Sequence, residues 1–225
     1  PPAHGVACTV RVRSHSQGTV RHLASTAEPQ DKPATLLDVL QDWKQTWMWD
    51  DLRMSGSQDW LLTAIREGTC IAVTDNSYMA DILPNCSSAA FVFECSKGRG
   101  RLMGSFPEQA AVANAYRGEL LGLLAIHLIL LALHRLDSAL EGNVIVYSDC
   151  LGALDRISTL PTHRIPTGCK HSDILKSIML HCLKITVSIR YRHVDSHQDY
   201  QEEFLKLERE SQLNCLMDGA AKSVL

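Results

Sequence analysis

Two short apolar segments of this chain each end on an aspartate, and this pattern limits what the chain can fold into. Ile71-Ala72-Val73-Thr74 leads into Asp75, and Val144-Ile145-Val146-Tyr147-Ser148 leads into Asp149. Short runs rich in β-branched residues are typical of strands buried in a sheet, where an unpaired charge is expensive. Carboxylates at the ends of two buried strands are therefore expected to share a cation.

Two further acids lie in segments with helical spacing. Glu119 stands in Arg117-Gly118-Glu119-Leu120 among apolar neighbours, so its side chain is expected to face the sheet, and Asp218 ends Asn214-Cys215-Leu216-Met217-Asp218. Carboxylate oxygens are ligands that suit Mg²⁺ or Mn²⁺. Two such ions about 4 Å apart can stabilise both oxygens of a phosphoryl displacement. The predicted ligands of a two-ion site are Asp75, Glu119, Asp149 and Asp218.

Composition narrows the class of protein. At 225 residues the chain can bury one sizeable core with a small appendage. The net charge of −3 counts mildly against nucleic-acid binding by charge alone. The longest apolar run, Leu120 to Leu133, is too short to span a bilayer and predicts a central buried helix.

The eight cysteines include no Cys-x-x-Cys pair. A zinc or disulfide framework is therefore not expected, and a reducing compartment is the simpler interpretation. We accordingly expect an intracellular protein, cytoplasmic or nuclear. The sequence begins at Pro1 without a signal peptide, and we interpret it as a piece of a longer chain.

Three regions follow from the composition along the chain. Residues 1–35 are rich in Pro, Ser, Thr, His and Gly and are typical of a flexible linker or tail. Residues 36–66 hold all four tryptophans and have helical spacing, which indicates a Trp-rich helical arm that packs on the main domain. The alternative for this arm is an aromatic platform for nucleic-acid bases. Residues 69–225 form the predicted catalytic domain.

The main domain alternates between strand and helix patterns. A hairpin around Lys97-Gly98-Arg99-Gly100 is followed by a long helix and then by alternating elements. This order predicts an α/β fold, a five-stranded mixed sheet (β-β-β-α-β-α-α-β-α) with helices on both faces. The predicted strands are 70–74, 88–95, 101–106, 143–148 and 185–194, and the predicted helices are 111–136, 149–157, 172–182 and 209–224, with Ser172 as a cap.

Five motifs in this order resemble those of the ribonuclease H family over about residues 69–225. Thr74-Asp75-Asn76-Ser77 looks like the family's Thr-Asp-Gly-Ser, Arg117-Gly118-Glu119-Leu120 like its Arg-Met-Glu-Leu, and Tyr147-Ser148-Asp149 like its Thr/Ser-Asp. Asn214 to Asp218 is similar to its Asn-x-x-x-Asp, and His193 to His197 is similar to its Val-x-Gly-His. The amino-acid sequence around Glu119 and Asp149 resembles that of ribonuclease H domains of retroelement polyproteins, in which a reverse transcriptase precedes the domain.

The resemblance implies hydrolysis of the RNA strand of RNA–DNA hybrids with two Mg²⁺ or Mn²⁺ ions. Asp75 would bridge the ions, the three other acids would complete their ligand shells, and His197 would move a proton or help product leave. Four residues are expected at the substrate: Asn76, Ser77, Tyr116 and Arg117. No basic, Trp-rich segment follows the third predicted helix, so another domain is expected to add substrate affinity.

Several alternatives stay open at this point. Asp149 could cap the following helix instead of binding metal, and His193 with His197 could form a zinc pair. Transposases and integrases of the same fold place their Glu after the second Asp, whereas Glu119 lies between Asp75 and Asp149. A catalytically weak or inactive domain with a structural or nucleic-acid-binding role would be expected to have lost one acid. A Ser or Cys hydrolase is not favoured, because no Gly-x-Ser-x-Gly motif is present.

Overall fold

The structure is a computed structural model that describes residues 35–43, 45–160, 165–166 and 168–225. Residues 33–225 form one compact unit. The tail predicted over residues 1–35 lies outside the described residues except for Thr35, as do residues 161–164 and 167 between the predicted helices 149–157 and 172–182.

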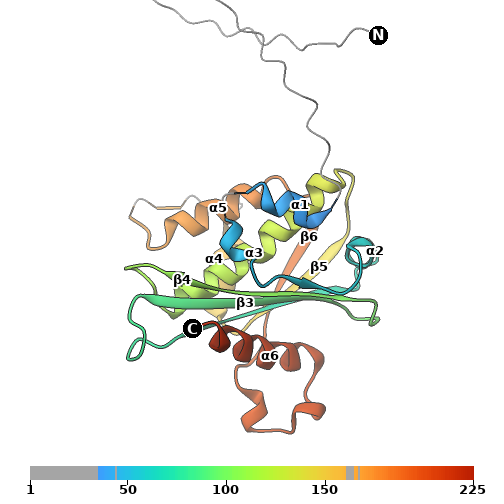
Figure 1. Cartoon of the computed structure of the whole chain (residues 1–225). Helices are drawn as coiled ribbons and strands as arrows, with labels where there is room; N and C mark the ends of the chain where they lie inside the picture. Colours follow the sequence, from blue (N-terminus) through green and yellow to red (C-terminus); the bar gives the residue numbers. More distant parts are fainter. Residues whose placement is uncertain (1–34, 44, 161–164, 167) are drawn as a thin grey trace, which may run out of the picture. The chain divides into compact units, whose positions relative to one another are not determined.

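A mixed sheet is the centre of this unit (Figure 1). Its strand order is β1-β4-β3-β2-β5-β6, with β2 parallel to β5, β5 parallel to β6, and every other neighbouring pair antiparallel. Strands β2 and β5, which carry or lead into Asp75 and Asp149, are parallel neighbours, an arrangement that lets the two carboxylates share a cation as expected. The strands are β1 (Arg53–Met54), β2 (Cys70–Tyr78), β3 (Cys86–Cys95), β4 (Arg101–Gln109), β5 (Asn143–Ser148) and β6 (Ser188–His193).

The sheet has six strands, one more than predicted. The additional strand β1 pairs only two residues with β4, and Ser55 extends the contact by donating its backbone N–H to the carbonyl of Arg101 at 2.9 Å. A strand of two residues has no periodicity to detect in a sequence, so its pairing is visible only in the structure.

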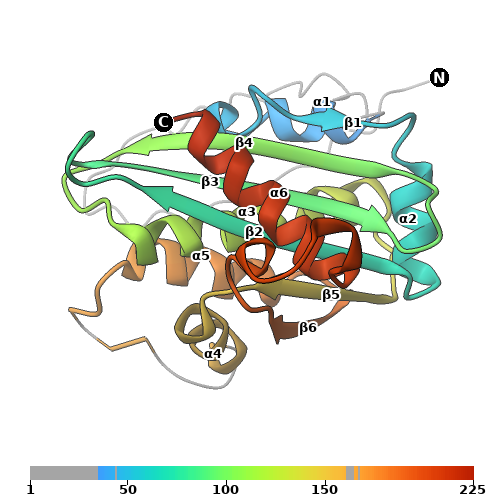
Figure 2. The ribbon, with the colours of Figure 1, turned by 90° about the horizontal axis from the view of Figure 1, so that it is seen from below.

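Helices cover both faces of the sheet, as predicted. Helix α6 lies on one face, and α3 lies on the other with α1, α4 and α5 packed around it (Figures 1 and 2). The helices are α1 (Leu36–Gln41), α2 (Asp59–Arg66), α3 (Ala115–Leu136), α4 (Leu151–Thr159), α5 (Ser172–Cys182) and α6 (Arg209–Ser223), with short 3₁₀ turns η1 (Thr46–Met48), η2 (Gln198–Tyr200) and η3 (Phe204–Lys206).

Alternation along the central strands divides the core between the two faces. In β3, Phe91 and Phe93 belong to the large core under α3, whereas Ala90 and Val92 belong to a smaller core under α6. Successive side chains of a strand point to opposite faces, and both sets are fully buried. The central strands are thus apolar on both sides, and a polar residue among them needs a specific partner.

The Trp-rich arm is part of the main core. Trp49 and Trp60 are buried in the large core, Trp47 meets Phe106 edge-on at 5.3 Å between ring centroids, and Trp43 carries the guanidinium of Arg135 on its ring. The indoles therefore pack against the domain, the first of the two arrangements considered for the arm.

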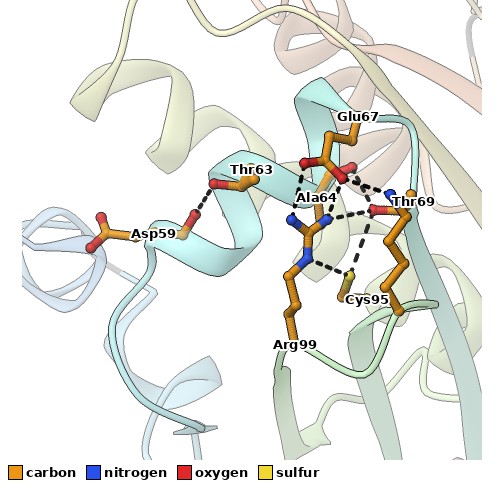
Figure 3. Close-up of polar contacts among 8 residues, drawn as sticks. Asp59, Thr63, Ala64, Glu67, Thr69, Cys95 and Arg99 are labelled. Carbon is orange, nitrogen blue, oxygen red and sulfur yellow. Dashed lines mark hydrogen bonds and ion pairs between the residues drawn. The ribbon is translucent and has the colours of Figure 1, made fainter.

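A polar cluster fastens the end of this arm to the hairpin (Figure 3). Arg99, in the turn after β3, donates to both carboxylate oxygens of Glu67, which follows α2, at 3.0 and 2.5 Å. The same guanidinium donates to the Cys95 sulfur at 3.4 Å and to the Thr69 hydroxyl at 3.2 Å. The exposed tip of the hairpin is thereby tied to the segment that leads into β2.

Helix α3 approaches β2 unusually closely. A Cβ atom on Gly122 would lie 1.9 Å from Oγ1 of Thr74, and one on Gly118 would lie 2.9 Å from Cβ of Asn76. The helix is long and apolar enough to cross a membrane by length and composition, but 78% of its most apolar window is buried inside the unit. It is the central helix that the sequence predicts, and its glycines bring Glu119 to the sheet.

Some element boundaries differ from those predicted. Strand β2 continues three residues beyond Asp75, to Tyr78, because its pairing with β3 extends that far. Ser172 is the first residue of α5 and caps nothing, since His171 is the N-cap and makes no side-chain cap. Helix α3 begins at Ala115, where the Asn114 side chain accepts from the Arg117 N–H.

Candidate metal centre

Asp75 and Asp149 lie side by side where the parallel pairing of β2 and β5 ends. The register pairs Val73 with Tyr147, so the two aspartates stand level with each other two positions further along. Asp149 follows the last residue of β5, whereas α4 has Cys150 as its N-cap and no side-chain cap. Asp149 is therefore not the cap of that helix, which removes the structural alternative considered for it.

Glu119 reaches the same point from α3. Its side chain is buried, and one carboxylate oxygen accepts a short hydrogen bond from Nδ2 of Asn76. The other oxygen accepts from the Ser148 hydroxyl at 3.2 Å. Because Ser148 ends β5 and Asn76 lies in β2, these two bonds fix the carboxylate between the strands that carry the two aspartates.

The three carboxylates form a compact group. Asp75, Glu119 and Asp149 can each offer an oxygen such that all these oxygens lie within 4.8 Å of one another. Burial, and then the neighbouring charge of Asp149, raise the pKa of Asp75 to about 8. Burial raises the pKa of Glu119 well above its ordinary value, with the two aspartates adding to the rise, and burial also raises that of Asp149.

The group fits a divalent cation. Two buried carboxylates and a half-buried third of like charge cannot all ionise cheaply by themselves, and no lysine or arginine is hydrogen-bonded to these three among the described residues. Hard oxygen ligands match Mg²⁺ or Mn²⁺. No histidine or cysteine belongs to the group, which argues against a zinc site within the described part of the chain.

Asp218 lies beside this group but outside it. Its carboxylate accepts from the ammonium of Lys222, one turn further along α6, at 2.7 Å, and the charge of Asp218 contributes to the raised pKa of Asp75. The structure thus brings three of the four predicted ligands within range of one ion and holds the fourth next to them, on a lysine.

His197 lies on the Asp218 side of the centre. Its Nδ1 is 4.0 Å from a carboxylate oxygen of Asp218, and its ring stacks on Tyr200 with centroids 5.4 Å apart and planes inclined by 20°. The backbone of His197 has a φ of 52°, a value that is uncommon outside glycine and concentrates at functional sites. His193 lies on the Asp149 side, with its Nε2 3.0 Å from the backbone carbonyl of Asp149.

Two residues that orient the centre were not predicted individually. Asn214 is buried and donates to Asp75 at 3.2 Å, opposite the backbone N–H of Asn76, which donates to the other oxygen at 2.7 Å. Lys222 was not singled out either. Both lie four positions from Asp218 on α6 and so share its face of the helix, a spacing that could have indicated them.

The four predicted substrate residues are in different environments. Asn76 is engaged with Glu119, and Ser77 is buried. Tyr116 is half-buried beside the His171 ring, at 6.0 Å between centroids. Arg117 is 8% exposed, and its guanidinium donates to Glu108 at 2.7 and 2.8 Å and to Asp173 at 3.2 and 2.9 Å. The structure therefore places Arg117 in a fully paired internal network that joins α3, β4 and α5.

Comparisons with solved structures give matches of low sequence identity. The first is the crystal structure of LC11-RNase H1 in complex with an RNA/DNA hybrid, with 13% identity, a TM-score of 0.50, and coverage of 69% of this chain and 95% of that one. The prototype foamy virus protease-reverse transcriptase matches with 18% identity and a TM-score of 0.49 over 69% of this chain and 20% of that one. The N-terminal RNase H domain of rv2228c from Mycobacterium tuberculosis matches with 16% identity and a TM-score of 0.44 over 69% and 98%.

No protein-family model matches the sequence, and no curated protein matches it. The likeness to solved structures therefore bears on the fold, which agrees with the sheet order and helix placement described above. The acidic group lies at the same point of the sheet as the sequence motifs predicted. Together these observations show that the chain folds as a ribonuclease H-like domain.

Proposed function

We propose that this domain is a metal-dependent endonuclease that hydrolyses the RNA strand of RNA–DNA hybrids. The observation that carries the proposal is the compact group of buried Asp75 and Glu119 with half-buried Asp149 on a ribonuclease H-like fold. Three neighbouring carboxylates with raised pKa values lower the stability of the folded domain when they ionise, and a bound cation would offset that loss of stability. The LC11-RNase H1 structure contains an RNA/DNA hybrid, which supports this substrate class.

The residues have separable tasks in this proposal. Asp75, Glu119 and Asp149 would hold divalent ions, and Asp218 would join them once released from Lys222. When bound, such ions supply charge stabilisation for the attacking and leaving oxygens of a phosphoryl displacement. Asn214 and the Asn76 N–H keep the two oxygens of Asp75 in place.

His197 is the candidate for proton transfer. Its Nδ1 lies 4.0 Å from the Asp218 carboxylate, and an imidazole can both donate and accept a proton through its ring nitrogens. Its Nδ1 can give a proton to, or take one from, a group held at the Asp218 side of the centre. The ring is exposed enough to do so, since half of the side chain is accessible.

The origin of the chain is a separate part of the proposal. The motifs around Glu119 and Asp149 resemble retroelement domains, and a protease-reverse transcriptase is among the structural matches. We propose that the domain works downstream of a reverse transcriptase in an intracellular setting. Co-expression of a longer chain that includes the upstream sequence, followed by a primer-extension assay, tests this part independently of cleavage.

The proposal is tested by cleavage of a hybrid with a labelled RNA strand. With Mg²⁺ or Mn²⁺ the protein is expected to cut the RNA and to leave the DNA strand and single-stranded RNA intact, and Asp149→Asn is expected to be inactive. Asp155→Asn is the matched control, because Asp155 is an exposed aspartate on α4 and should retain full activity. If the wild-type protein is inert with both metals, the catalytic proposal fails and the domain has a structural or binding role.

A further inference from the structure

Two arginines on the edge strand β6 stand apart from the other arginines of the described residues. Each of the others has a partner: six pair with carboxylates, one lies on a tryptophan ring, and one donates to a cysteine sulfur (Arg53, Arg66, Arg99, Arg101, Arg117, Arg209, Arg135 and Arg156). The side chains of Arg190 and Arg192 make no hydrogen bond or ion pair in the described part of the chain, and both residues are exposed.

The sheet register shows which way these two side chains point. Arg190 pairs with Ile145 and Arg192 pairs with Tyr147 on the neighbouring parallel strand β5. Residues paired in this way share a face of the sheet, and Tyr147 packs in the core under α6. Arg190 and Arg192 therefore lie on the α6 face, whereas Ile189 and Tyr191, which alternate with them along β6, face α4 and α5.

The same face leads directly to the metal centre. Asp149 follows Tyr147 by two residues and so continues the line of side chains on the α6 face. Arg192 stands beside Tyr147, and Arg190 lies about 6.6 Å further back along the strand, at two residues of strand rise. Helix α6 packs mainly on β2 and β3, and in Figure 2 it crosses those strands and leaves β6 beyond it. The two guanidinium groups thus stand open on a strand that ends at the acidic cluster.

We propose that Arg190 and Arg192 bind the phosphate backbone of the nucleic-acid duplex whose scissile bond lies at the metal centre. This inference rests on the proposed function and names the surface that holds its substrate. Guanidinium forks suit phosphate oxygens, and an unpaired arginine has its full donor set free for them. A chain with a net charge of −3 has no general attraction for a polyanion, so local unpaired cations must supply it.

Exposed charges on an edge strand also have a structural use, because they hinder pairing with strands of other molecules. The two roles predict different effects of removing the arginines. If the arginines only protect the edge strand, their removal increases aggregation and leaves the affinity for nucleic acid unchanged. Phosphate contacts contribute to the salt dependence of binding, with a slope of about 0.7 to 0.9 in log affinity against log salt for each contact.

The experiment measures binding of a fluorescent RNA–DNA hybrid in EDTA between about 50 and 200 mM salt. It compares the wild type with Arg190→Gln, Arg192→Gln, the double variant and Lys184→Gln. Lys184 is exposed, forms no ion pair with the residues that the structure describes, and lies just after α5. It precedes β6, which runs parallel to β5, so it lies at the opposite end of these strands from Asp149 and serves as the matched control. Each arginine variant is expected to reduce the slope by about 0.7 to 0.9 and the double variant by about twice that, with Lys184→Gln unchanged.

Mn²⁺ binding by calorimetry is measured alongside and is expected to be the same in all four variants. A wild type that cuts the hybrid while the double variant keeps the wild-type slope overturns this inference and leaves the proposed function standing. A wild type that neither binds nor cuts the hybrid overturns both. Equal loss of slope in Lys184→Gln also contradicts the inference, because the attraction would then be a general effect of charge.

Discussion

Replacing Asp75 with asparagine is expected to stabilise the metal-free protein at alkaline pH. Asp75 is 5% exposed, and its pKa rises from 3.8 to about 8 because of burial and then the charge of Asp149. A folded-state pKa above the unfolded one means that the folded state binds the proton more tightly. Stability is therefore greatest at low pH and falls as the pH rises from about 4 towards about 8, by about 1.4 kcal/mol per pH unit for one group.

The full effect for Asp75 alone is about 6 kcal/mol above pH 8 as an upper value, because the neighbouring carboxylates take up part of the protons. Asp75→Asn removes this ionisation and keeps the shape of the side chain. The assay is urea unfolding in EDTA at about one-unit steps from pH 5 to pH 9, with the midpoint and slope recorded for each protein. The variant is expected to gain most at pH 9 and least at pH 5.

Divalent metal should reverse the order of stability. Mn²⁺ binds the folded wild type and adds stability by mass action, whereas Asp75→Asn lacks a carboxylate of the group and should gain little. Asp155→Asn, which removes an exposed aspartate, is expected to follow the wild type throughout. If metal-free Asp75→Asn unfolds at lower urea than the wild type at pH 9, then burial of like charges is not what governs this site, and the case for a cation weakens with it.

Three further changes test other parts of the structure. Lys222→Met should lower the apparent dissociation constant for Mn²⁺ by roughly twofold, since an exposed helix pair is worth about 0.3–0.5 kcal/mol, and Lys222→Arg should not; calorimetry decides. Gly122→Ala should cost about 1–3 kcal/mol of unfolding free energy because its Cβ meets the Thr74 hydroxyl, while Gly219→Ala, with open space around it, should be neutral or stabilising. Arg117→Met should lower the free energy of unfolding by about 3–5 kcal/mol and leave the salt slope of hybrid binding unchanged. A variant as stable as the wild type would contradict a stabilising role for the Arg117 network.

The order of the main elements could be predicted because the signal is local. Apolar β-branched runs and a long apolar helix need no knowledge of the rest of the chain. Strand β1 and the turns η2 and η3 could not be predicted, since two or three residues carry no periodic pattern. The extent of β2 beyond Asp75 is also a tertiary effect, because β3 continues to pair with it as far as Tyr78.

The candidate site was also predictable only in part. The closeness of Asp75 and Asp149 could be predicted from the sequence, because parallel neighbouring strands place their equivalent ends at one edge of the sheet. The Asp218–Lys222 pair is a local i,i+4 contact within α6, whereas the sequence could not show that Asn214 holds Asp75, since that contact depends on how α6 is rotated against the sheet. Helical spacing from Asp218 suggests both residues but gives no reason to prefer them over their neighbours.

Substrate contacts are harder to predict than metal ligands for a physical reason. A carboxylate in a buried strand is conspicuous wherever it occurs, because its cost must be offset. An arginine is informative only when its partners are known, and these come from distant segments. Arg117 lies within the most recognisable helical motif, yet Glu108 and Asp173 occupy its guanidinium. Arg192 lies in no motif, and only the pairing of β6 with β5 places it, unpaired, beside the line of residues that ends at Asp149. If the salt slopes follow Arg190 and Arg192, substrate binding in this domain depends on cations that the fold leaves without partners.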